Sequence, residues 1–186
     1  MLVGAASAQD RFNVSLRAGV GDGERLLTSF HFGGTMQYNI TPWLGVLLRA
    51  DSYESFGGSS RDAVVNITKT LTIAQLADHD IYSIDRGLLR FYGVGLAIQP
   101  VGFWRADSRH VVSLSGGLGY AHAYSAMSRE PDVILDFYNN RGLAYFVNVQ
   151  YRYKVTSWLS MGPYVGMLVA NAFQLNCGVT CSFDLQ

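Results

Sequence analysis

The sequence predicts an all-β chain, folded as one eight-stranded, antiparallel, up-and-down transmembrane β-barrel. Segments of about ten residues alternate between apolar side chains and polar or small ones, which is the pattern of strands with two different faces. The connections between these segments sort into short turns at one end and longer segments at the other. Because no run of ~20 apolar residues is present, only a closed barrel could carry this chain through lipid.

The alternation defines eight strands in chain order. Within residues 142–169, for example, Tyr145 and Val147 share one face, whereas Phe146 and Asn148 share the other. An even number of strands of this length suits a bacterial membrane barrel. The predicted strands, with the start of their apolar faces, are residues 11–20 (Phe12, Val14, Leu16), 27–40 (Phe30, Phe32), 43–54 (Leu44, Val46, Leu48), 88–98 (Tyr92, Val94, Leu96), 110–122 (Val112, Leu114), two runs within residues 142–169, and 176–185 (Val179, Cys181, Phe183).

Two of the connections repeat one turn sequence. Ile40-Thr-Pro-Trp-Leu44 joins the second and third strands, and Val155-Thr-Ser-Trp-Leu159 joins the sixth and seventh. We predict short periplasmic turns at this end, both termini in the periplasm, and longer extracellular segments at residues 56–87 and 127–141. The tryptophans of the short-turn end form a predicted aromatic girdle at the membrane interface: Trp43, Trp104 and Trp158.

Composition decides which face meets lipid. Lys69 and Lys154 are the only lysines, which is unusual for a surface exposed to water. A soluble lipocalin-like barrel alternates in the same way, but the glycine-rich polar face and the grouped tryptophans favour lipid outside. Charge balances at fourteen basic and fourteen acidic residues, which gives no reason to expect a nucleic-acid partner.

The first nine residues look like the remainder of an export signal, since Ala6-Ser7-Ala8 has the small-x-small pattern of a signal-peptidase site. A tag or a frayed terminus is the alternative. The barrel domain is then residues 10–186.

The polar face would line a narrow lumen that side chains fill, so a wide pore is disfavoured and a narrow channel ranks third among the possible functions. Buried charges are costly unless they are paired, and we therefore expect a network of salt bridges and hydrogen bonds. Its predicted members are Arg17, His31, Arg49, Asp51, Asn148, Gln150, Arg152, Tyr164 and Asp184.

With these features, nearly the whole chain after Asp10 resembles the small eight-stranded outer-membrane barrels of the OmpA and OmpX type. The resemblance implies a Gram-negative outer membrane and a non-catalytic structural, adhesive or complex-forming role. Recognition is expected through the extracellular loops, above all residues 56–87, where residues 64–73 have the character of an extracellular strand or hairpin. Expected partners are outer-membrane lipid, lipopolysaccharide and another outer-membrane or surface protein, with no cofactor.

The alternative is a lipid A-modifying enzyme. His31, Asp51 and Ser52 are similar to the residue types of the outer-membrane palmitoyltransferase barrel, but Ser52 is predicted to face lipid while the other two face the lumen. His122 and Ser125 loosely resemble the serine and histidine of lipid A deacylase barrels, at a different spacing.

Three further features bear on possible sites. Arg90, on the lipid face, could contact a lipopolysaccharide phosphate or extend to the headgroups without a specific contact. Cys177 and Cys181 would be about 13 Å apart in an extended strand, so a disulfide needs a turn at Gly178. The Asp78-His-Asp80 cluster is weak evidence for a cation, and we predict no metal site.

Overall fold

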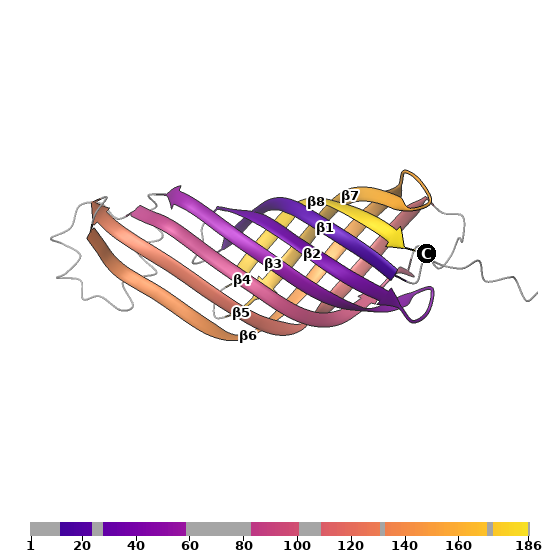
Figure 1. The fold of residues 1–186 in the computed structure, drawn as a ribbon, viewed down its shortest axis with the longest axis horizontal. Coiled ribbons are helices and arrows are strands. Elements are labelled where there is room, and N and C mark those ends of the chain that lie inside the picture. Colours follow the sequence, from indigo (N-terminus) through magenta and orange to yellow (C-terminus); the bar gives the residue numbers. More distant parts are fainter. Residues whose placement is uncertain are drawn as a thin grey trace, which may run out of the picture.

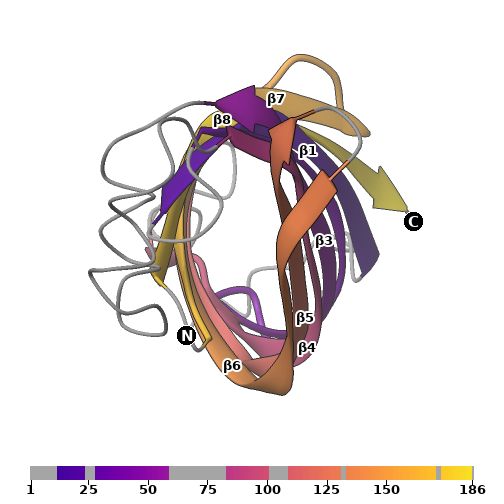
Figure 2. The same ribbon diagram turned by 90° about the vertical axis from the view of Figure 1, so that its left-hand side faces the viewer.

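The computed structural model describes residues 12–23, 28–58, 83–100, 109–130, 133–170 and 173–185. These residues form a closed barrel in which each strand pairs with the next and the last pairs with the first, as Figures 1 and 2 show. All pairs are antiparallel, which confirms the predicted fold class. The strands are β1 (Phe12–Gly23), β2 (Ser29–Asn39), β3 (Leu44–Gly58), β4 (Ser83–Ile98), β5 (His110–Glu130), β6 (Val133–Lys154), β7 (Leu159–Val169) and β8 (Phe173–Leu185).

The outer surface of the barrel is apolar and the inner surface is mixed. Leu143 is 73% exposed and Leu16 is 58% exposed, although both lie in the middle of strands. Their neighbours Ser15, Arg17 and Ala144 point inward and are buried, as the predicted alternation requires. A broad apolar outer wall is the surface that lipid contacts in a membrane barrel. Among the described residues, no helix has the length and apolar character needed to span a membrane.

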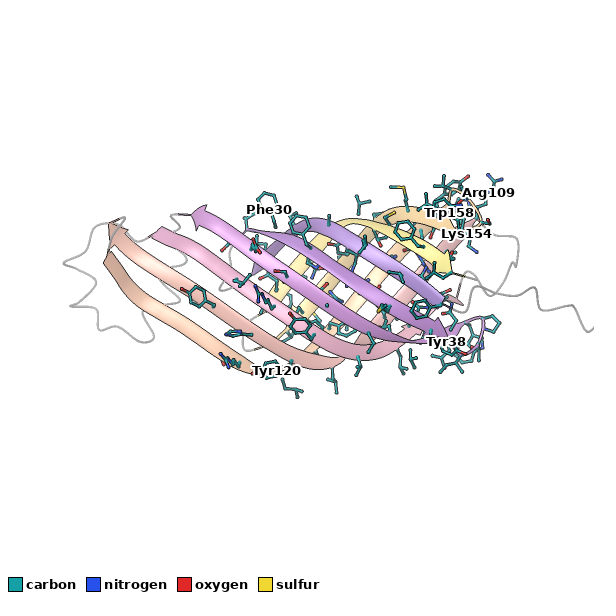
Figure 3. All side chains as sticks on the ribbon, in the orientation of Figure 1. Phe30, Tyr38, Arg109, Tyr120, Lys154 and Trp158 are labelled. Atoms are coloured by element: carbon teal, nitrogen blue, oxygen red, sulfur yellow. The ribbon has the colours of Figure 1, made fainter. Side chains whose placement is uncertain are left out.

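The short turns at one end are built alike. In both repeated turns a threonine hydroxyl accepts a hydrogen bond from the backbone N–H three residues later: Leu44 to Thr41 and Leu159 to Thr156, each at 3.0 Å. Trp43 and Trp158 are exposed in these turns, at the end where β1 starts and β8 stops. Figure 3 labels Trp158 at this end. Trp104 lies outside the described residues.

Several strands are longer than the sequence pattern indicates. The pattern places a connection at residues 127–141, whereas β5 runs to Glu130 and β6 starts at Val133. Likewise, β3 and β4 extend into the predicted connection at residues 56–87. The physical reason is that alternation comes from contact with lipid, whereas strand pairing needs only backbone hydrogen bonds. The ladder therefore continues after the amphipathic pattern has ended.

The unequal lengths leave part of the sheet projecting beyond the barrel. Pairing of β2 with β3 ends at Phe30 and Glu54, and pairing of β6 with β7 ends at Tyr145 and Val169. Beyond these points β3, β4, β5 and β6 continue together, and Figure 1 shows β5 and β6 reaching furthest. We call this four-stranded extension the wall; it comprises residues 55–58, 83–87, 125–130 and 133–138.

Candidate functional site

A buried charged cluster occupies the lumen at mid-barrel. Arg17 of β1 donates from Nη2 to Oδ1 of Asp51 at 2.9 Å, and Arg49 donates from Nε to the other carboxylate oxygen. These three side chains are almost completely shielded from solvent. One carboxylate thus holds two guanidinium groups, so each of the two buried positive charges depends on the same partner.

His31 completes the cluster and is held on three sides. Its Nε2 lies 3.1 Å from Oδ1 of Asp51, and its Nδ1 forms a hydrogen bond with the hydroxyl of Tyr164. The ring also stacks on Tyr53, with centroids 4.4 Å apart. Tyr53 in turn accepts a hydrogen bond from Nδ2 of Asn176 at 2.9 Å. The arrangement fixes the imidazole by packing and by polar contacts, so both of its nitrogens are engaged.

The register of β2 and β3 brings these groups together. His31 pairs with Tyr53, and Gly33 pairs with Asp51. A Cβ atom built on Gly33 would lie 1.9 Å from Oδ1 of Asp51, so any side chain there would collide with the carboxylate. Glycine at this position therefore gives Asp51 the space to reach Arg17 and His31.

A second polar group lies between this cluster and the short-turn end. Ser15 of β1 and Ser182 of β8 share a hydrogen bond of 2.7 Å, and Asn13 donates to Asp184 at 2.6 Å. Gln150 of β6 donates to Thr180 of β8 at 3.1 Å, over the inner face of β7. We call the inward-facing residues of β8, β1 and β2, together with Asp51 of β3, the polar arc. Apart from glycines, all of its buried residues are polar or charged, namely Asn13, Ser15, Arg17, Ser29, His31, Gln37, Asp51, Gln174, Asn176, Thr180 and Ser182.

The opposite side of the lumen is filled differently. Phe91 of β4 and Phe146 of β6 pack edge to face, with ring centroids 5.6 Å apart. We call the inward-facing residues of β4 and β5, together with Phe146 of β6, the apolar arc. It includes four glycines over which the two rings lie: Gly93, Gly95, Gly117 and Gly119. The guanidinium of Arg49 lies 4.5 Å from the centroid of Phe146, which joins the two sides of the lumen through a cation–π contact.

This geometry does not assemble the catalytic group considered from sequence. His31 and Asp51 face the lumen, whereas Ser52 lies on the outward face of β3 next to Phe32 and Arg90. A base in the lumen cannot reach a hydroxyl on the other side of the sheet. His122 also lies on the outward face, on β5, and the side chain of Ser125 is outside the described part of the structure.

The predicted lumen residues all come from inward-facing positions. Arg17, His31, Arg49, Asp51 and Tyr164 meet in the charged cluster, and Gln150 and Asp184 belong to the second polar group. Asn148 and Arg152 are buried in the lumen as well. Within the described part of the chain, Oδ1 of Asn148 and Nε of Arg152 form no hydrogen bond. Further lumen residues could have been predicted from sequence, because they occupy the same alternate, inward-facing positions along their strands. They are Asn13, Ser15, Tyr53, Asn176, Thr180 and Ser182.

The two cysteines are free thiols on the outward face of β8. Cys177 pairs with Val20 and Cys181 with Leu16, and Gly178 between them pairs with Gly19 in an uninterrupted ladder. The turn that a disulfide would need is absent, so the bridge considered from sequence is not formed. The Asp78-His-Asp80 cluster and the strand expected at residues 64–73 lie outside the described residues.

No family model and no curated relative matches the sequence. Solved structures match the fold. Neisserial surface protein A aligns with 96% of this chain and 100% of its own, at 12% identity and a TM-score of 0.64. A major outer membrane protein from Thermus thermophilus aligns with 92% of this chain and 99% of its own, at 12% identity and a TM-score of 0.57. Ail of Yersinia pestis, in complex with the heparin analogue sucrose octasulfate, aligns with 92% of this chain and 97% of its own, at 12% identity and a TM-score of 0.53. The chain therefore has the fold of the small eight-stranded outer-membrane β-barrels.

Proposed function

We propose that this chain is a non-catalytic outer-membrane module in which a rigid barrel carries a recognition surface on its long-strand end. The observation that carries the proposal is the wall, because four strands continue past the barrel where lipid no longer requires them. The outer-membrane location is part of the proposal, with both termini and the short turns in the periplasm and the wall outside the cell.

The filled lumen supports a structural role for the barrel itself. Arg17, Arg49 and His31 converge on Asp51, and Phe91 and Phe146 fill the opposite side. A lumen packed in this way makes the barrel a rigid support for the wall, and it disfavours a wide pore. The connection at residues 59–82, which joins two strands of the wall, is the longest between strands and belongs to the proposed recognition surface.

One edge of the wall suits recognition of another protein. β6 pairs with β5 as far as Val133, but the described part of β7 pairs with β6 only from Tyr145 onward. The backbone edge at residues 133–138 is therefore presented to a partner that could add a strand to it. We propose a surface or outer-membrane protein as this partner.

The test is the native mass of the protein extracted from its own membrane in mild detergent. In a shortened variant, residues 126–137 are removed and Ser125 is joined to Tyr138 through Asn-Gly, because these two residues are directly paired and a two-residue turn keeps the register. The matched control replaces residues 24–27, at the same end but outside the wall, with Gly-Ser-Gly-Ser.

We expect the wild type and the control to carry a stoichiometric protein partner and the shortened variant to lose it. A wild-type barrel that carries only lipid, or a shortened variant that keeps the partner, would overturn the proposal. Lipid A from cells with His122→Ala or His31→Ala should have unchanged acyl chains; a changed acylation pattern would favour the enzymatic alternative instead.

A further inference from the structure

Three basic side chains form one row on the outside of the barrel. Arg90 of β4 pairs directly with His122 of β5, which pairs directly with Arg141 of β6. Ser52 of β3 continues the row on the other side of Arg90. Residues that pair directly have Cβ atoms about 5 Å apart, so the two arginines are about 10 Å apart with the histidine between them. We call this set the basic row.

The basic row lies at the upper limit of the apolar surface. The next positions toward the short-turn end are Tyr92, Tyr120 and Leu143, which are 58%, 50% and 73% exposed. From there down to Ile98 on β4, Val112 on β5 and Tyr153 on β6, every outward-facing side chain is uncharged. Tyrosines immediately below a charged row are typical of the boundary between lipid tails and headgroups.

Strand lengths agree with this position. From Arg90 to Ile98 the chain covers roughly 26 Å along β4, and from Arg141 to Tyr153 roughly 40 Å along β6. For strands tilted by about 40°, these lengths correspond to roughly 20 Å and 30 Å along the barrel axis, on either side of the ~25 Å apolar band of membrane barrels. The basic row therefore meets the headgroups of the leaflet at the long-strand end.

The two arginines of the row have no ion-pair partner among the described side chains. The described salt bridges all belong to the lumen, and none involves Arg90 or Arg141. Glu54, on the outward face of β3, is the nearest acidic residue by strand register, one diagonal position from Arg90. Asp22, also exposed, lies on β1. Among the side chains that the structure describes, the acidic groups of the outer rim therefore lie on β1 and β3, and the basic groups on β4 to β6.

We propose that the basic row binds the phosphorylated headgroup of lipid A, with Arg90 and Arg141 holding phosphate oxygens and Ser52 donating a further hydrogen bond. Guanidinium groups bind phosphate through two parallel hydrogen bonds, and two of them on alternate strands suit a headgroup that carries more than one phosphate. Two guanidinium groups about 10 Å apart repel one another near low-dielectric lipid, and a bound phosphate relieves that repulsion. The inference rests on the proposed outer-membrane location and orientation.

Native mass spectrometry of the purified, folded barrel in detergent tests the site, with diphosphorylated lipid A as the probe. The variant is Arg90→Gln/Arg141→Gln, and the matched control is Arg109→Gln, an exposed arginine at the short-turn end. Because two charge-assisted contacts are removed, we expect the variant to bind lipid A at least about tenfold more weakly than wild type, with the control within about twofold. A dephosphorylated lipid A with the same acyl chains should bind wild type as weakly as the variant binds the parent lipid.

Three results would overturn the site: equal binding by variant and wild type, an equal loss in the Arg109→Gln control, or no effect of removing the lipid A phosphates. Equal binding of phosphatidylglycerol would assign the row to phospholipid headgroups in general and overturn the lipid A assignment. The assay contains no protein partner, so its failure leaves the recognition role of the wall untouched. Conversely, loss of the partner complex would not change lipid binding by the barrel.

Discussion

The polar arc and the apolar arc fill opposite sides of one lumen by different means. In the polar arc, position is set by directional contacts such as Arg17 to Asp51 at 2.9 Å and Ser15 to Ser182 at 2.7 Å. In the apolar arc, Phe91 and Phe146 lie over strands that carry glycine on their inner face. The polar arc depends on pairing hydrogen-bond donors with acceptors. The apolar arc depends on packing aromatic rings against glycines, which have no side chain.

Because the two arcs are packed differently, substitutions should destabilise them by different mechanisms. Removing an acceptor from the polar arc leaves charges buried without a partner, whereas adding an atom to the apolar arc creates a steric collision. Arg49 connects the arcs, since it donates to Asp51 and stacks on Phe146. The following substitutions test this contrast in order of decreasing expected effect, each by the free energy of unfolding in lipid vesicles, followed by tryptophan fluorescence in urea.

Asp51→Asn should have the largest effect. It removes the only carboxylate that contacts Arg17, Arg49 and His31 in the described structure, and we expect a loss of about 3–5 kcal/mol. Ser52→Ala is the matched control, since this neighbouring residue faces outward and should change stability by less than about 0.5 kcal/mol. A loss below about 1 kcal/mol for Asp51→Asn would mean that the two guanidinium groups do not depend on this carboxylate.

Gly119→Ala tests the apolar arc. A Cβ atom on Gly119 would lie 2.2 Å from the carbonyl oxygen of Tyr92 and 2.6 Å from Cε2 of Phe91, so both backbone and ring must shift. We expect a loss of about 1–3 kcal/mol. In the control, Gly34→Ala, the added atom faces outward and approaches no closer than 3.5 Å, so stability should hardly change. Equal effects of the two substitutions would contradict a packing role for the inner glycine.

Tyr53→Phe should have the smallest effect, because the ring that stacks on His31 is kept. Only the hydroxyl that accepts a hydrogen bond from Asn176 is lost, which should cost about 1 kcal/mol. Tyr92→Phe, on the lipid-facing side of β4, is the control and should be close to neutral. If Tyr53→Phe were neutral as well, the hydrogen bond to Asn176 would contribute nothing measurable.

The alternation of side chains was enough to predict the strand order, the outward face and the inward orientation of His31 and Asp51. Lipid on one side and packing on the other impose a strict period of two, and the repeated Thr-x-Trp turns set the register. The ends of β5 and β6 could not be found in this way, because strands outside lipid need no apolar face. The bulges that shift their pairing near Met127 also break any periodic pattern.

The contacts inside the lumen were harder to predict than the residues that make them. Alternate positions along each strand identified Arg17, Arg49 and Asp51 as inward-facing. The contacts of both arginines with Asp51 depend in addition on the stagger of the strands around the barrel. The basic row was missed for a related reason. Arg90, His122 and Arg141 are far apart in sequence, and only the registers of β4, β5 and β6 bring them side by side.

The ladder between β1 and β8 has a consequence for the order of events during assembly. β1 pairs with residues 174–185 along its whole length, so its second partner is the last of the eight barrel strands to be synthesised. Until then the sheet has two open edges, and lipid offers no hydrogen-bond partner to either of them. Closure cannot proceed strand by strand from β1 alone, because one of the two ladders of β1 is made with β8, the last strand of the barrel. The nascent chain must therefore be protected from aggregation until β8 is available, and closure and insertion must occur together.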